Sequence, residues 1–222
     1  MVNTKHAFWM AFFFTLAVFL IGLLVGIFVE NARADNIQNV LLDSEINLLD
    51  EQLKENAIQE FNISCNLAKN STFNFADKIY EEALRLEKYD SASKMKDTLT
   101  IFHKRYDLLR ILLWTNSMKI RSKCHSDFHT IVYLYDYDTR DISKKAEQIA
   151  MSNLLLDFKY KYPQETLLIP IAANLNIESI NLIKEEYNVT NSPVIIIDES
   201  MVIRSLPTFN GLENIVFQSN NK

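Results

Sequence analysis

The chain contains neither glycine nor proline between Glu30 and Tyr162. These two residues interrupt helices most strongly, so their absence over this stretch favours long, continuous helical segments. All four prolines lie at or after Pro163, where the pattern of apolar residues also changes. The 222 residues are therefore expected to combine a helical N-terminal part with a C-terminal part of different architecture.

The overall charge argues against one class of partner. The formal net charge at pH 7 is -5, whereas domains that bind nucleic acid are normally basic. The sequence therefore predicts no nucleic-acid partner.

Residues 7–29 carry no charge and are rich in Phe, Leu, Val and Ile. As a helix this segment would be about 33 Å long, enough to cross a hydrocarbon core of roughly 30 Å. Lys5 precedes it, so the positive-inside rule predicts that residues 1–6 are cytoplasmic and that the chain after residue 30 is outside the cell membrane. The alternative is a cleaved signal peptide, because residues 32–34 read Ala-Arg-Ala, a small-x-small cleavage pattern.

Two glycines lie within this apolar segment. Gly22 and Gly26 have the small-xxx-small spacing that lets two membrane helices approach closely. The spacing suggests a homodimer formed through these residues, with the lipid bilayer as the surrounding solvent.

Residues 35–124 form a region with helical periodicity. Predicted breaks at residues 70–72 and 90–93, both rich in helix-capping residues, divide it into three apolar stripes. The prediction is an antiparallel helical hairpin or three-helix coiled-coil stalk; the alternative is a surface that receives a partner's helix. The stripes are Ile37, Leu41, Leu48, Leu49, Leu53 and Phe61; Phe75, Ile79, Ala83, Leu86 and Tyr89; and Met95, Leu99, Phe102, Tyr106, Leu109, Leu113, Asn116 and Ile120.

The only two cysteines, Cys65 and Cys124, belong to this helical region. Outside the cytoplasm such thiols tend to be oxidised, and a bridge would close a loop of about 60 residues. The third helix looks longer than the second, so Cys124 could stand about 20 Å beyond Cys65 unless the first helix continues or the third ends early. The alternative is a reactive free thiol at Cys124, because Arg121, Lys123 and His125 would favour a thiolate.

Beyond Cys124 the apolar pattern changes to short strands that alternate with helices. The order implies a β-α-β unit with a right-handed crossover within a four-stranded mixed sheet, and a proline at position 170 places its strand at an edge. The fold class is therefore α+β overall, with a C-terminal domain at residues 128–218 and a tail at residues 219–222. The expected strands are 130–135, 167–172, 194–197 and 201–206, and the expected helices are 142–162, 177–187 and 211–218.

Residues 131–135, the helix after them and the loop Thr190-Asn191-Ser192-Pro193-Val194 resemble the thioredoxin-like family over about 95 residues. The resemblance is to prokaryotic, archaeal-type, membrane-anchored members with a helical region before the domain. It implies that Pro193 is the family's cis-proline beside the active site. It also implies that residues 139–142, Thr-Arg-Asp-Ile, stand where relatives carry Cys-x-x-Cys.

The replaced motif excludes disulfide exchange at this position, because exchange needs an attacking thiolate and a resolving thiol. Thr139 keeps its proton without a strong base, and Ile142 has no heteroatom. No catalytic residue is predicted here, and the domain is not expected to be an enzyme. What remains is a groove for extended polypeptides, with candidate residues Tyr135, Tyr137, Thr139, Ser192 and Pro193.

Several polar positions match part of a known catalytic or binding motif, but the rest of the motif is missing. Asp136 and Asp138 follow a strand, as in haloacid-dehalogenase-like phosphatases or a hard-cation site, but no later motif completes the set. Residues 194–198 resemble a Walker B strand, yet the chain has no glycine-rich phosphate loop. The histidines lack metal-ligand spacing. The sequence predicts no metal and no cofactor.

Three functions remain open. The first is a membrane-tethered, redox-inactive thioredoxin-like module that binds exported polypeptides or a membrane protein partner, as a chaperone or scaffold. The second is a thiol-disulfide oxidoreductase or accessory in which Cys65 and Cys124 cycle. The third is a structural membrane scaffold that acts through its helical stalk.

Overall fold

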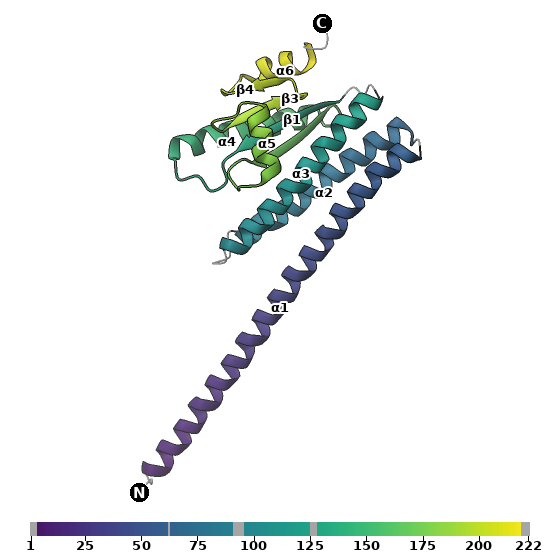
Figure 1. Ribbon diagram of the computed structural model, residues 1–222. Coiled ribbons are helices and arrows are strands. Elements are labelled where there is room, and N and C mark those ends of the chain that lie inside the picture. The colour runs from purple at the N-terminus through teal and green to yellow at the C-terminus, as the bar shows by residue number, and fades with distance from the viewer. Residues whose placement is uncertain (1–3, 62, 91–95, 125–127, 219–222) are drawn as a thin grey trace. The chain divides into compact units, whose positions relative to one another are not determined.

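Figure 1 shows the computed structural model, which describes residues 4–61, 63–90, 96–124 and 128–218. The chain forms two compact units, Met1–Asp50 and Glu51–Lys222. The α+β class is confirmed. The elements are α1 (Thr4–Glu60), α2 (Cys65–Asp90), α3 (Lys96–Cys124), β1 (His129–Tyr135), α4 (Ile142–Lys161), β2 (Thr166–Ala172), α5 (Glu178–Glu186), β3 (Val194–Ile197), β4 (Met201–Ile203) and α6 (Phe209–Gln218).

The described residues of the first unit belong to α1. Phe8–Glu30 is a stretch of 23 residues, long and apolar enough to cross a membrane, with its side chains exposed. A methyl group built on Gly22 or Gly26 would meet no atom within 4 Å, so this face of the helix has room for a neighbour. The predicted apolar helix is confirmed in length and composition, and dimerisation through the glycines stays a prediction.

The helix does not end with the apolar stretch. α1 continues without a break to Glu60, because residues 31–35 contain no glycine or proline to stop it. The predicted separate helix from residue 35 onward is therefore the second half of α1. α1 ends at Glu60 and α2 begins at Cys65, and the carbonyl oxygen of Ser64, just before α2, accepts a hydrogen bond from the backbone amide of Ala68.

The predicted break at residues 70–72 is wrong. These residues lie inside α2, where Thr72 is buried and its hydroxyl donates to the carbonyl oxygen of Ala68 at 3.0 Å. This bond to the preceding turn satisfies the hydroxyl that was expected to cap a helix end. The second predicted break begins where α2 ends, at Asp90, but residues 91–95 lie outside the described residues.

The sheet is four-stranded and mixed, as predicted, with strand order β2-β1-β3-β4. β1 pairs in parallel with β2, with His129 opposite Thr166 and Tyr135 opposite Ala172. β3 runs antiparallel to β1 and to β4. Pro170 lies in β2, an edge strand, where one missing backbone donor is tolerated. The predicted burial of residues 194–197 on both faces is also confirmed.

Helices cover both faces of the sheet. On one face, α4 and α6 enclose a core that includes Ile131 and Ile195. On the other, α3 and α2 lie alongside β2 and β1 (Figure 1). The described members of the third predicted stripe are all buried, so that seam is confirmed as core: Phe102, Tyr106, Leu109, Leu113, Asn116 and Ile120.

The helical hairpin therefore shares its core with the sheet. The ring of Phe73 in α2 meets the ring of Phe128, just before β1, edge-on at 5.4 Å. Both rings are buried, and α2, α3 and the sheet fall within the unit Glu51–Lys222. Cys124 and Phe128, on either side of the predicted domain boundary, belong to this same unit, and the predicted domain bounds stay a prediction. A sheet with two apolar faces needs a helical layer on each.

Candidate functional site

Residues 139–142 lead into α4, which begins at Ile142. Asp141 is the N-cap, and its carboxylate accepts a hydrogen bond from the backbone amide of Lys144 at 3.1 Å. Thr139 Oγ1 accepts a weaker bond from the amide of Asp141 at 3.3 Å. Ile142 is 84% exposed. These positions present a capped helix end and an exposed aliphatic side chain.

A polar cluster made of Asp136, Lys144, Gln148 and Ser192 joins three segments at this end of the sheet. The Asp136 carboxylate accepts hydrogen bonds from Ser192 Oγ and, at 2.7 Å, from Lys144 Nζ. The Gln148 side chain accepts from the Asp136 amide at 2.8 Å and donates to its carbonyl at 3.1 Å. Burial raises the pKa of Asp136, but the hydrogen bonds from Lys144 and Ser192 outweigh it and hold the pKa below its usual value.

The Asp136 cluster brings together some of the residues predicted to line the groove. Ser192 is tied to the end of β1, and it precedes buried Pro193 through a cis peptide bond. Thr139 follows Asp136 closely along the chain, three residues before α4 begins. The contacts of Lys144 and Gln148 with Asp136 were not predicted, because they cross from α4 to the end of β1.

The two tyrosines of the predicted groove are engaged with α3. Burial raises the pKa of Tyr135, whose hydroxyl interacts with Arg110. The backbone amide of Tyr137 donates to Asn174 Oδ1 at 2.8 Å, and its ring centroid lies 4.0 Å from that of His103. Both tyrosines therefore connect the end of β1 to neighbouring elements.

A buried carboxyl group lies near these tyrosines. Asp107 of α3 is 1% exposed, and its Oδ1 accepts from Arg110 at 3.1 Å, whereas its Oδ2 has no hydrogen-bond partner among the residues that the structure describes. Burial raises the pKa of Asp107 to about 6, although Arg110 and the backbone amide of Ala172 oppose this rise. The folded protein therefore binds a proton at Asp107 more readily than the unfolded chain does.

Asp107→Asn is expected to stabilise the protein at neutral pH. Since the folded-state pKa lies above the ordinary 3.8, the stability from this group is complete below about pH 4 and is lost as pH rises through about 6. The full loss is about 3 kcal/mol. Urea unfolding of full-length protein in detergent should show the variant more stable at pH 8 and similar to wild type at pH 4. The exposed Asp157→Asn is the matched control, and equal pH dependence in Asp107→Asn and wild type would contradict the assignment.

The two cysteines form a disulfide. The Cys65 and Cys124 sulfurs lie 2.05 Å apart, and the Cα atoms 5.5 Å apart. The expected difference in height does not arise, because α2 begins at Cys65 itself, beside the end of α3. The predicted bridge is confirmed, and the free thiol at Cys124 is wrong.

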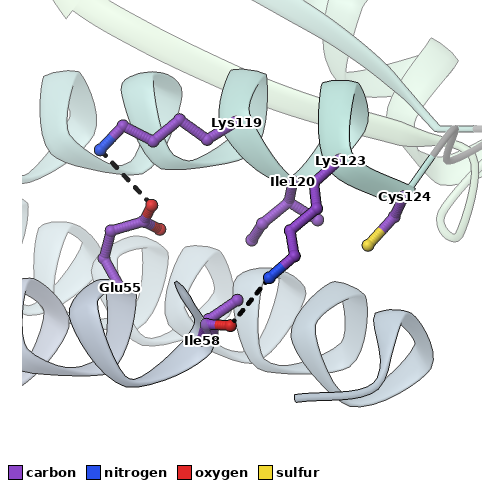
Figure 2. A pocket seen from close by; sticks show the side chains of 6 residues that line it. All are labelled: Glu55, Ile58, Lys119, Ile120, Lys123 and Cys124. Atoms are coloured by element: carbon purple, nitrogen blue, oxygen red, sulfur yellow. Dashed lines mark hydrogen bonds and ion pairs between the residues drawn. The ribbon is translucent and has the colours of Figure 1, made fainter. Parts of the chain in front are cut away.

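A small, mostly apolar cavity of about 150 Å³ borders the disulfide (Figure 2). Lys123 Nζ donates to the carbonyl oxygen of Ile58 at 3.1 Å, and Lys119 pairs with Glu55 at 3.4 Å. These two contacts join α3 to the last turns of α1. The lining residues are Glu55, Ile58, Lys119, Ile120, Lys123 and Cys124.

A second polar network at the other end of β1 was not predicted. Arg121 of α3 pairs with Asp198 at 3.0 Å and Glu199 at 2.8 Å, and Glu199 also accepts from Trp114 Nε1 at 2.7 Å. His129 Nδ1 lies 2.6 Å from Asp198 Oδ2. The expected strands 194–197 and 201–206 leave residues 198–200 as the connection between them, with no predicted contact to the helices. The sequence feature that could have indicated this network is the pair Asp198 and Glu199, two acidic residues directly after a buried strand.

This Arg121 network attaches α3 to the turn between β3 and β4. Burial raises the pKa of Asp198, but hydrogen bonds from His129 and Thr130 and the charge of Arg121 outweigh it and lower the pKa. The carboxylate therefore stays ionised and paired. Among the described residues, no group of three or more His, Cys, Asp or Glu side chains could hold a metal ion.

Comparisons with known proteins assign the chain to no family. No protein-family model matches the chain, and no curated protein matches it.

Proposed function

We propose that this protein is a membrane-anchored, redox-inactive thioredoxin-like protein that binds exported polypeptides. The proposal includes a cytoplasmic N-terminus, a single membrane-spanning segment and an extracytoplasmic C-terminal region. The apolar stretch Phe8–Glu30 supports the anchor. Near its start, Trp9 contacts the rings of Phe12 and Phe13, and tryptophan is one of the residues that gather at membrane interfaces.

The observation that carries the thioredoxin-like assignment is the sheet topology. Strand order β2-β1-β3-β4, with a parallel β1-α4-β2 unit followed by α5, an antiparallel β3-β4 pair and α6, agrees with the resemblance of the sequence. Thr139 and Ile142 then occupy the helix start where the thiols of the family would stand. This domain includes α2 and α3 as a supporting layer in place of a separate coiled-coil stalk.

The proposed activity is non-covalent polypeptide binding at the end of β1. The Asp136 cluster fixes the loop before Pro193 against α4, which gives a rigid edge for an extended chain. Exposed Ile142 provides an apolar contact beside that edge. Thr139 and Ser192 provide polar groups, so the site can hold a chain but has no thiol with which to react.

Ile142→Lys is expected to weaken polypeptide binding roughly tenfold, because one apolar contact is worth about 1.5 kcal/mol. The measurement is fluorescence anisotropy of labelled, reduced and carboxymethylated lactalbumin, which cannot fold, added to full-length protein in lipid nanodiscs. Tyr160→Lys is the matched control, since Tyr160 is an exposed residue of the same helix about 27 Å away. Equal affinities for all three proteins would contradict binding at this site.

A second candidate, thiol-disulfide exchange through Cys65 and Cys124, has one observation in its favour. Cys65 is exposed, and Cys124 lines the cavity beside the bridge. An incoming thiolate could attack Cys65 and release Cys124 as the leaving thiolate. This candidate requires a bridge that opens readily with mild reductants.

A further inference from the structure

The cavity beside the disulfide lies between two helices of one unit. Glu55 and Ile58 come from the last turns of α1, and Lys119, Ile120 and Cys124 come from the end of α3. Figure 2 shows the Ile120 side chain extending from α3 toward α1, where Ile58 lies. Both isoleucines are buried, and all of these residues belong to the unit Glu51–Lys222. The cavity is therefore a feature of that unit alone.

The polar groups around the cavity already have partners. Lys123 Nζ donates to the carbonyl oxygen of Ile58 at 3.1 Å, and Lys119 Nζ lies 3.4 Å from a carboxylate oxygen of Glu55. A water molecule inside a protein needs several polar partners, so a mostly apolar space holds it poorly. An empty space also forfeits the contacts that its lining atoms could make. The cavity therefore favours an apolar occupant over water.

The volume of the cavity sets the size of that occupant. It measures about 150 Å³, and an apolar cavity of about this volume in another protein takes up benzene. A single six-membered ring or a branched chain of about six carbons therefore fits beside Ile58 and Ile120. A molecule of two rings is too large.

The charges at the rim decide which polar group the occupant carries. Among the described residues that line the cavity, Lys119 and Lys123 are basic and Glu55 is acidic, so the lining has a surplus of positive charge. The Lys119 side chain is 56% exposed, and its contact with Glu55 is a long one. Lys119 can therefore turn toward a second carboxylate without leaving water. A ligand with an ammonium group would be repelled by both lysines.

We propose that this cavity is a binding site for a small carboxylate with an apolar body of about one ring, such as a benzoate. The ring lies beside Ile58 and Ile120, and the carboxylate pairs with Lys119. The bound molecule bridges α1 and α3 and needs no reaction at the disulfide. This site does not depend on the polypeptide site at the end of β1, because the two share no residue.

The test uses full-length protein in lipid nanodiscs and measures binding of para-fluorobenzoate by fluorine NMR. The neutral probe of similar shape is para-fluorobenzyl alcohol, and empty nanodiscs give the signal of probe that enters the lipid. The carboxylate is expected to bind about fivefold more tightly than the alcohol, because only the carboxylate gains an ion pair with Lys119. Equal binding of the two probes would overturn the proposal.

Lys119→Gln keeps a donor for Glu55 but removes the charge, so it is expected to weaken binding of the carboxylate about fivefold and to leave binding of the alcohol unchanged. The matched control is Lys145→Gln, at an exposed lysine of α4, which should bind both probes as wild type does.

Ile58→Phe places a larger side chain at the cavity and is expected to abolish binding of both probes. Urea unfolding checks that this variant is folded, and Lys119→Gln decides in either case because its side chain is largely exposed. Binding of the carboxylate that Lys119→Gln leaves unchanged would contradict the site.

Discussion

Changing both Cys65 and Cys124 to serine is expected to lower the free energy of unfolding by about 4 kcal/mol. The bridge joins residues 59 positions apart, and in the chain-entropy model a loop of that length restricts the unfolded state by this amount. The loss should be large because the bridge holds the start of α2 against the end of α3. The check is urea unfolding of full-length protein in detergent, followed by circular dichroism.

The control for the cysteine variant is wild-type protein treated with a strong reductant, which should unfold at the same urea concentration as the double serine variant. A loss below about 1 kcal/mol would contradict a stabilising role for the bridge. Thiol titration in glutathione buffer separates the two candidate functions. A bridge that stays closed agrees with a structural disulfide, whereas one that opens and re-forms readily favours the oxidoreductase.

Arg121→Met is expected to destabilise the protein by about 3 to 5 kcal/mol. The substitution leaves Asp198 and Glu199, which are 12% and 17% exposed, without the cation that pairs with both. Two poorly hydrated carboxylates that repel each other cost more free energy than the lost packing of one side chain. Thermal and urea unfolding of the full-length protein measure the effect.

Arg140→Met is the control for this prediction, since Arg140 is exposed near the start of α4, and its stability should match wild type. Adding Glu199→Gln to Arg121→Met should recover part of the loss. The added amide is neutral and keeps an oxygen that can accept from Trp114. If the double variant is no more stable than Arg121→Met alone, uncompensated charge is not the cause of the loss.

The position of α1 shows where periodicity alone misleads. Leu49 and Leu53 belong to a predicted apolar stripe and were expected to be core, yet both are exposed. The face of α1 that is buried carries Glu51 and Glu55, which find lysine partners on α1 and α3. A hydrophobic pattern identifies an amphipathic helix, but it does not say which neighbour covers its apolar face.

The site was predictable only in part, for a similar reason. The sequence placed Thr139 at the start of a helix after β1 and Pro193 in the loop before β3, because strand and helix patterns bound both loops. It did not predict that Asp136 would be held by Lys144, Gln148 and Ser192. Those bonds join the end of β1 to α4 and to the loop before β3, at separations of 8, 12 and 56 residues, and local residue preferences carry no information about contacts between different elements.

By itself the sequence determined the apolar helix of Phe8–Glu30, the helical character up to Cys124 and the strands and helices of the mixed sheet. These depend on helix breakers and on periods of 3.6 and 2 residues, which act over one or two turns. Only the tertiary structure decided that α1 ends at Glu60 and α2 begins at Cys65, that Cys124 meets Cys65 and that Arg121 joins α3 to the β3–β4 turn. Each of these depends on how faces of distant elements are packed and how their charges are paired, and that is settled by the free energy of the whole fold.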